Sequence, residues 1–209
     1  YANVMEEDYL YWYRRGLQPV FNRTKEYNEW ILNKVCVNVA SEITDFKNGF
    51  FLMQAAFYTS RRPGKKSKVD KLNEYLYRSG KQNADNELAN WFHTVGKAAL
   101  YVESNDDPDI PVKAYALDPR SAFVVYSLRP GRKPAYGVNM VIHEGSISVD
   151  VFTDSRVYRL SGSAIARTTT PYPEYESIAI ALDSVEPNPL GHIPIIEYRY
   201  NSVNMAAPE

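Results

Sequence analysis

The sequence predicts an α+β fold in which helices come first and antiparallel strands follow. In the first half of the chain, apolar residues recur every three or four positions, as in helices with one buried face. From Ala98 onward the interval changes to two, which is typical of strands. Turn residues separate these short strands closely, and this favours an antiparallel meander over alternating helices and strands. We therefore expect a mainly helical part at 1–97, an antiparallel β part at 98–201, and the start of a further segment at 202–209.

The first half is expected to contain four helices, at residues 6–15, 25–46, 69–78 and 84–97. Gly16 and the pair Ser79-Gly80 are natural helix ends, because glycine adopts the helix-stopping backbone conformation at little cost. The second helix has the strongest pattern, since its apolar residues form one stripe that we expect to face a core. These residues are Ile31, Val35, Val39 and Ile43. The aromatic-rich residues 50–59 are expected to be extended.

The second half is expected to contain a strand starting at Ala98 and further strands at 112–117, 123–127, 136–143, 146–153, 156–160, 177–182 and 193–200. The breaks between them hold aspartate, glycine and proline, which are the residues that turns favour. Glu144-Gly145 and Asp154-Ser155 are the positions where we expect tight hairpin turns.

Composition limits the classes of function. The chain has 209 residues, a net charge of −1 and 23% charged residues, without the basic excess typical of a dedicated nucleic-acid binder. Its 17 tyrosines are the one compositional excess, which suits strands and subunit contacts. Cys36 is the only cysteine, so no intrachain disulfide is expected and a reducing site of folding fits. No apolar run approaches the roughly 20 residues of a membrane span, so no membrane partner is expected.

Catalytic and metal-binding motifs are missing from the sequence. The three histidines show no metal-ligand spacing, and neither a phosphate-binding loop nor a nucleophile elbow is present. Asp106, Asp107 and Asp109 surround a proline but lack the glycine and distal glutamate of a calcium loop, which favours a solvated acidic turn. We therefore expect no catalytic residues, no cofactor and no metal.

The densest basic segment runs from residue 61 to residue 71. Its cations include Arg61, Arg62, Lys65, Lys66 and Lys68. Lysine and arginine neutralise phosphates regardless of sequence, so this segment is a candidate electrostatic contact with DNA or with an acidic partner. A solvated surface loop is the alternative, because that is the usual role of a charge run.

Three consecutive aromatic residues, Tyr11, Trp12 and Tyr13, form a second candidate contact. Adjacent residues on a helix point about 100° apart, so the three cannot all face one core. Some of them are expected to face another subunit or another part of the chain. Trp30 and the pair Trp91-Phe92, also on expected helices, are expected in the core.

The run Asn188-Pro-Leu-Gly-His-Ile-Pro-Ile-Ile-Glu-Tyr198 has an order that turn chemistry explains only in part. It resembles the signature N-P-L-G-x-I-P-[IV]-[IV]-E-[FY] of portal proteins, the ring-shaped head-to-tail connectors of tailed double-stranded-DNA phages. A second motif of that family, D-P-x-x-A-F-V-V-Y, is matched at 118–126. Weaker matches in the same order occur at 33–51, 91–102 and 129–153.

The resemblance implies a structural protein that assembles into a ring of about twelve subunits at one capsid vertex. The implied partners are terminase, a head-tail adaptor, the scaffold or major capsid protein, and duplex DNA passing without sequence specificity. The implied location is the virion, after synthesis in the bacterial cytoplasm. The chain resembles the wing of the subunit, with the channel helices, clip and tunnel loop outside it. Because a ring needs two different complementary faces on each subunit, we expect the wing alone to be monomeric in solution.

Two other functions remain as alternatives. One is a non-portal virion or prophage adaptor with a similar α+β core. The other is a hydrolase that uses carboxylates such as Asp45, Asp118 or Asp183. A glycoside hydrolase would need two such groups in one pocket, about 5–10 Å apart.

Overall fold

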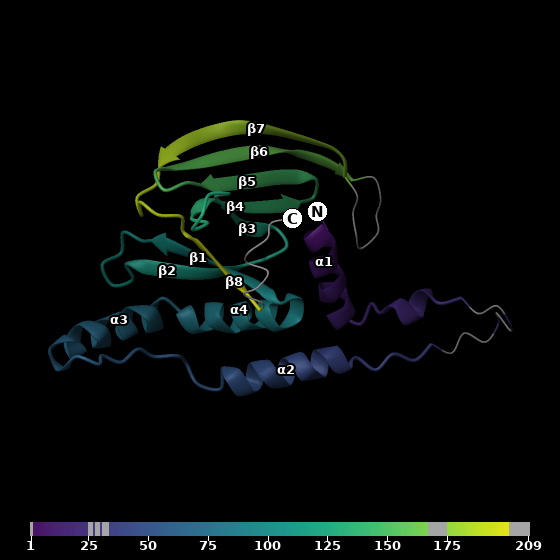
Figure 1. Ribbon diagram of the computed structural model, residues 1–209, viewed down its shortest axis with the longest axis horizontal. Helices are drawn as coiled ribbons and strands as arrows, with labels where there is room; N and C mark the ends of the chain where they lie inside the picture. The colour runs from purple at the N-terminus through teal and green to yellow at the C-terminus, as the bar shows by residue number, and fades with distance from the viewer. Residues whose placement is uncertain (1, 25–26, 28–29, 31–33, 167–174, 201–209) are drawn as a thin grey trace.

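The computed structural model describes residues 2–24, 27, 30, 34–166 and 175–200 (Figure 1). It confirms the α+β prediction, because the helices come first in the chain and antiparallel strands follow. The helices are α1 (Ala2–Arg14), α2 (Val39–Phe51), α3 (Lys66–Arg78) and α4 (Lys81–Val95). Two short 3₁₀ turns, Pro19–Asn22 and Pro63–Lys65, lie between them.

The strands form two antiparallel sheets, with the order β2-β1-β8 in the smaller and β3-β4-β5-β6-β7 in the larger. Their bounds are β1 Lys97–Ser104, β2 Val112–Leu117, β3 Ala122–Tyr126, β4 Pro134–His143, β5 Ser146–Phe152, β6 Arg156–Ala166, β7 Tyr175–Pro187 and β8 Ile195–Arg199. All eight match predicted strands, although β6 and β7 are several residues longer than expected.

Both predicted hairpin turns are present. Glu144 and Gly145 have φ of 49° and 80°, the pair of positive values that a two-residue turn with the twist of the flanking strands requires. In the turn after β5, the backbone amide of Thr153 donates to the carbonyl of Arg156 over 2.8 Å. These turns set the register of β4, β5 and β6, in which Met140 pairs with Val149 and Val149 with Leu160.

Helices α2, α3 and α4 lie on one side of the smaller sheet, and α1 stands beside the sheets (Figure 1). Helix α4 packs on β1 and β2, and α1, α2 and α3 each contact α4. On the other side, the two sheets enclose a core of small and branched side chains. Its buried members are Ala99, Ala122, Val124, Phe152 and Ile195.

The predicted helix at 25–46 is wrong in its described central part. Residues 34–38 are not helical, and α2 begins only at Val39 and continues to Phe51. Asn38 caps the helix, because its side chain accepts a hydrogen bond from the amide of Ser41 over 3.3 Å. The β-branched residues Val35 and Val37 before it disfavour helix. The expected extended segment at 50–59 is wrong at its start, because Phe50 and Phe51 belong to α2. Residues 52–59 form no strand.

Two predictions of burial are also wrong. The apolar stripe on the predicted second helix does not face a core, because Val35 is 81% exposed and Val39 and Ile43 are each about half exposed. Ile31 of that stripe lies outside the described residues. Trp30 is 79% exposed, whereas Trp91 and Phe92 are half-buried on α4. Apolar residues at helical spacing indicate a face that favours burial, but the spacing does not identify what buries it.

Candidate assembly surfaces

A buried ionic cluster ties α1 to the smaller sheet. Lys97 Nζ lies 3.4 Å from a carboxylate oxygen of both Glu7 and Glu197, and it donates to the carbonyl of Pro119 over 2.9 Å. Arg199 also pairs with Glu197, whose side chain is fully buried. Burial raises the pKa of Glu7 even though the charge of Lys97 acts to lower it. The cluster fixes the start of the chain against β1 and β8.

A second cluster centres on Arg120, in the turn between β2 and β3. Its guanidinium pairs with Asp118 at 2.6 Å and with Asp8 of α1 at 2.8 Å. It also lies over the ring of Tyr11, with its carbon 3.9 Å from the centroid, while that ring stacks on Trp91 at 5.4 Å. Burial alone would lower the pKa of Arg120, but the two carboxylates raise it, so the group stays charged. Arg120 thus connects α1, α4 and the sheet.

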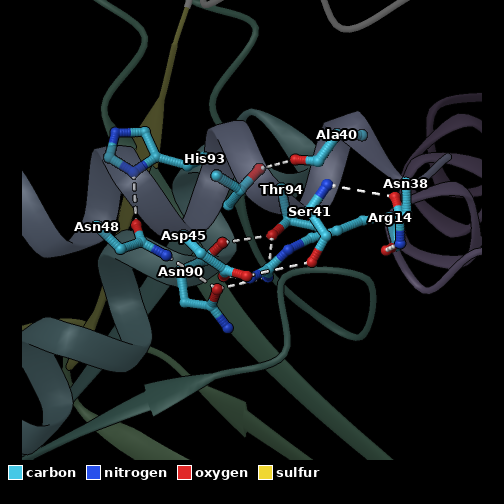
Figure 2. A network of polar contacts seen from close by, with 10 residues as sticks. Arg14, Asn38, Ala40, Ser41, Asp45, Asn48, Asn90, His93 and Thr94 are labelled. Carbon is cyan, nitrogen blue, oxygen red and sulfur yellow. Dashed lines mark hydrogen bonds and ion pairs between the residues drawn. The ribbon is translucent and has the colours of Figure 1, made fainter.

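A polar network joins α1, α2 and α4 (Figure 2). Arg14 donates to Asn90 and Thr94 of α4 and pairs with Asp45 of α2 at 2.6 Å. Further along, Asn48 of α2 donates to Asn90 over 3.1 Å and contacts His93 Nδ1 at 2.6 Å. Burial, and then the charge of Lys47, lower the pKa of His93.

An open cleft of about 490 Å³ lies beside this network. Arg14, Asn90, Trp91 and Thr94 are among the residues that line it. Arg14, Asn90 and Thr94 already bind one another, because Arg14 donates hydrogen bonds to both of the other side chains. The cleft therefore marks a helix junction, in which the polar groups stabilise the packing of three helices.

The turn before β8 is held by one side chain. Asn188 Nδ2 donates to the carbonyls of Thr153 and His192, over 2.7 and 2.8 Å. Its Oδ1 accepts from the amide of Leu190 over 3.0 Å. Gly191 has a φ of 62°, which glycine adopts without strain. The asparagine and the glycine of the run at 188–198 thus both build this turn, which leads the chain from the larger sheet into the smaller one.

Nearly the whole chain, including this turn, matches a protein-family model. The model is described as phage portal protein, SPP1 Gp6-like, and the match covers residues 4–206. The chain belongs to this family. No curated protein matches it. The resemblance noted in the sequence is therefore confirmed, and the family is a structural one whose members are components of the phage capsid.

In this portal chain the predicted basic segment lies around the start of α3. Arg61 and Arg62 precede the 3₁₀ turn, and Lys65, Lys66 and Lys68 follow in the turn and the first helical residues. All five side chains are exposed. Because Lys66 and Lys68 belong to α3, the segment is partly helix and not a continuous loop. No acidic residue lies in the first turn of α3 to offset these charges.

The three consecutive aromatics of α1 are each half-buried. Tyr11 is used within the chain, between Trp91 and Arg120, and it also meets the edge of Trp12 at 5.2 Å. Tyr13 packs against Tyr9 of the same helix, with ring centroids 5.9 Å apart. A contact of these aromatics with another subunit stays a prediction.

The carboxylates considered for hydrolysis occupy separate elements of the portal chain. Asp45 pairs with Arg14 on the helical side, Asp118 pairs with Arg120 in a turn, and Asp183 lies on β7. Across the described residues, no group of three or more histidine, cysteine, aspartate or glutamate side chains is placed to hold a metal ion. In the same part of the chain, no helix has the length and apolar character needed to cross a membrane.

Sequence reasoning missed the ionic cluster and the full extent of two apolar surfaces that the described residues leave uncovered. Glu7, Lys97 and Glu197 are far apart in the sequence, and no local pattern connects them. The uncovered surfaces lie on α2 and on β7. The sequence pattern includes only Val39 and Ile43 of the α2 surface, and it predicts that they face a core within the chain.

Proposed function

We propose that this chain is a subunit of the portal ring, with about twelve copies closing around one capsid vertex. The ring would form the channel for DNA packaging and ejection and the docking site for terminase and the head-tail adaptor, with the described fold as the wing. The observation that carries the proposal is the family match over residues 4–206, since membership implies a ring that works with the capsid and DNA.

Immunogold labelling of phage particles tests the proposal. Antibodies raised against this chain are applied to particles from the host that encodes it, opened mildly to expose internal epitopes. We expect gold at a single vertex of each head, where the tail joins. Labelling over the whole shell or along the tail, or no labelling, would contradict a portal role. An antibody against the major capsid protein of the same particles is the control and should label the shell uniformly.

We further propose that the basic segment at the start of α3 contacts duplex DNA without sequence preference. Its five cations are exposed and close together in the chain, and the first helical turn offers them no acidic partner. Neutralising phosphates releases counterions, so such a contact should be weak and strongly salt-dependent.

Replacing Lys65, Lys66 and Lys68 by glutamine is expected to lower DNA affinity. Fluorescence anisotropy with a labelled 30-base-pair duplex should show binding at about 10⁻⁵ M at physiological salt, within the usual range of non-specific contacts. The variant should bind about tenfold or more weakly, with a shallower dependence on salt. The matched control replaces the exposed Arg129, Lys133 and Arg156 by glutamine. Equal losses in the two variants would point to net charge alone and contradict a contact at this segment.

A further inference from the structure

Helix α2 is amphipathic, but its polar side faces the rest of the fold and its apolar side faces outward. The side that faces α4 carries polar groups, with Thr44 buried and Asn48 bonded to Asn90 and His93. The side that faces outward carries a stripe at spacings of four, three and four residues. Its members are Val39, Ile43, Phe46 and Phe50. Phe46 and Phe50 are 75% and 80% exposed, with rings stacked at 6.4 Å.

This stripe needs a partner outside the described fold. Large exposed apolar patches of this kind mark interaction sites, and a stripe at alternating four- and three-residue spacing suits packing against another apolar element. Exposed apolar side chains also occur in the segments that flank the helix, at Val35, Met53 and Phe57.

A second uncovered apolar surface lies on β7, at the edge of the larger sheet. Ile180 pairs with Gly162 and Leu182 with Leu160, so these side chains share a face with Ile178. A bulge at Asp183 shifts the register by one residue, which brings Val185 onto the same face, opposite Tyr158. All four side chains are exposed, and Leu182 is 57% exposed. Among the described strands, β7 pairs only with β6.

The two surfaces lie at opposite ends of the molecule, with α2 beyond the helices and β7 beyond the sheets (Figure 1). Their lengths are similar. The α2 stripe spans about 17 Å at 1.5 Å per residue. The β7 patch spans about 20 Å at about 3.3 Å per residue, after allowance for the bulge.

We infer that the apolar stripe of α2 in one subunit packs against the apolar face of β7 in a second copy of this chain. The inference rests on the proposed ring, and it names the contact within it. A closed ring requires head-to-tail contacts, in which one surface of each subunit meets a different surface of the next. The two uncovered apolar surfaces on opposite ends of this chain meet that requirement, whereas a patch that pairs with itself stops at a dimer.

Paired cysteines test the contact. In a Cys36→Ser background, which removes the chain's only cysteine, Phe46→Cys and Leu182→Cys are introduced together and separately. The proteins are treated with a mild oxidant and separated without reducing agent. The two positions lie at opposite ends of one molecule, so any disulfide between them joins two molecules. Disulfide-linked species accumulate during oxidation even when the contact is weak. The experiment therefore works with a chain that is monomeric when dilute.

We expect the double variant to form a ladder of dimers, trimers and longer species, while each single variant stays mainly monomeric. The matched control is Phe46→Cys with Leu128→Cys, since Leu128 is 91% exposed in the turn before β4, away from β7. Adding Ile43→Glu to the double variant should reduce the ladder at least fivefold, because it places a charge in the stripe.

Three outcomes would overturn the inference. Efficient dimers from Phe46→Cys alone would show that α2 pairs with α2 of another copy. Equal ladders from the double variant and its control would show random collision. No ladder would show that another segment or another protein covers the stripe. If gold labels a single vertex but no ladder forms, only this contact fails. If a ladder forms without vertex labelling, the contact stands and the portal role fails.

Discussion

Replacing Lys97 by methionine is expected to lower the free energy of unfolding by about 3–5 kcal/mol at pH 7. Methionine keeps most of the side-chain volume, so the change removes the charge and little packing. It leaves Glu7, whose side chain is 12% exposed, without its ion-pair partner, so that Arg199, which pairs with Glu197, is the remaining cation near both carboxylates. Urea denaturation followed by circular dichroism measures the loss.

The deficit of this variant should shrink as the pH falls from 7 towards 5. The folded-state pKa of Glu7 is raised above its ordinary value of 4.5. A raised pKa contributes stability that is fully present below 4.5 and is lost as pH rises through the folded-state value. Without Lys97 that value rises further, so protonation relieves the buried charge at a higher pH than in the unaltered chain.

Two further variants separate charge from packing. Lys68→Met, on the exposed start of α3, should change stability by no more than about 0.5 kcal/mol. Lys97→Met combined with Glu7→Gln should recover part of the loss, because no uncompensated carboxylate remains at Glu7. A loss below about 1 kcal/mol in Lys97→Met, independent of pH, would show that the cluster contributes little to stability.

Replacing Gly137 by alanine is expected to cost about 1–3 kcal/mol, because it inserts a methyl group where the two sheets meet. The new Cβ would lie 2.9 Å from Cγ2 of Ile193 and 3.3 Å from Cβ and Cδ1 of Ile195. Ile195 is a buried core residue and Ile193 packs against the same core, so neither side chain can move away without loss of packing. Thermal denaturation should show a lower midpoint.

Gly49→Ala is the matched control for this substitution. Gly49 lies within α2 with nothing near the added Cβ, so alanine there should stabilise the chain by up to about 1 kcal/mol through its helix propensity. Gly137→Ala together with Ile193→Ala should lose less than the sum of the single losses, since the second change removes the nearest clashing atom. Additive losses would mean that the clash with Ile193 is not the cause.

The strands could be predicted from the sequence because their signals are local. The two-residue alternation and the Glu144-Gly145 turn act within a few positions, and strand β2 was predicted to the residue at 112–117. The prediction of the second helix was wrong for a different reason. The start of this helix depends on the cap at Asn38, and among the described residues nothing builds a core over its apolar stripe.

The candidate surfaces were only partly predictable. The basic segment was visible because its charges are adjacent, and the structure adds that it surrounds a helix start. The run at 188–198 indicated the family, while the roles of its side chains required the fold. Glu197 closes an ionic cluster with Lys97, 100 residues earlier in the chain, and Asn188 reaches back to Thr153. Contacts between such distant positions leave no local pattern.

The place of β1 in the smaller sheet has a consequence for the order of folding. This central strand pairs with β2 soon after it in the chain, but its other neighbour is β8, and Lys97 lies opposite Arg199. During synthesis at about 5–20 residues per second, β1 must wait several seconds with one edge unpaired. Its edge stays open to other chains until β8 leaves the ribosome. Rapid docking of β8 therefore protects the nascent subunit from premature association.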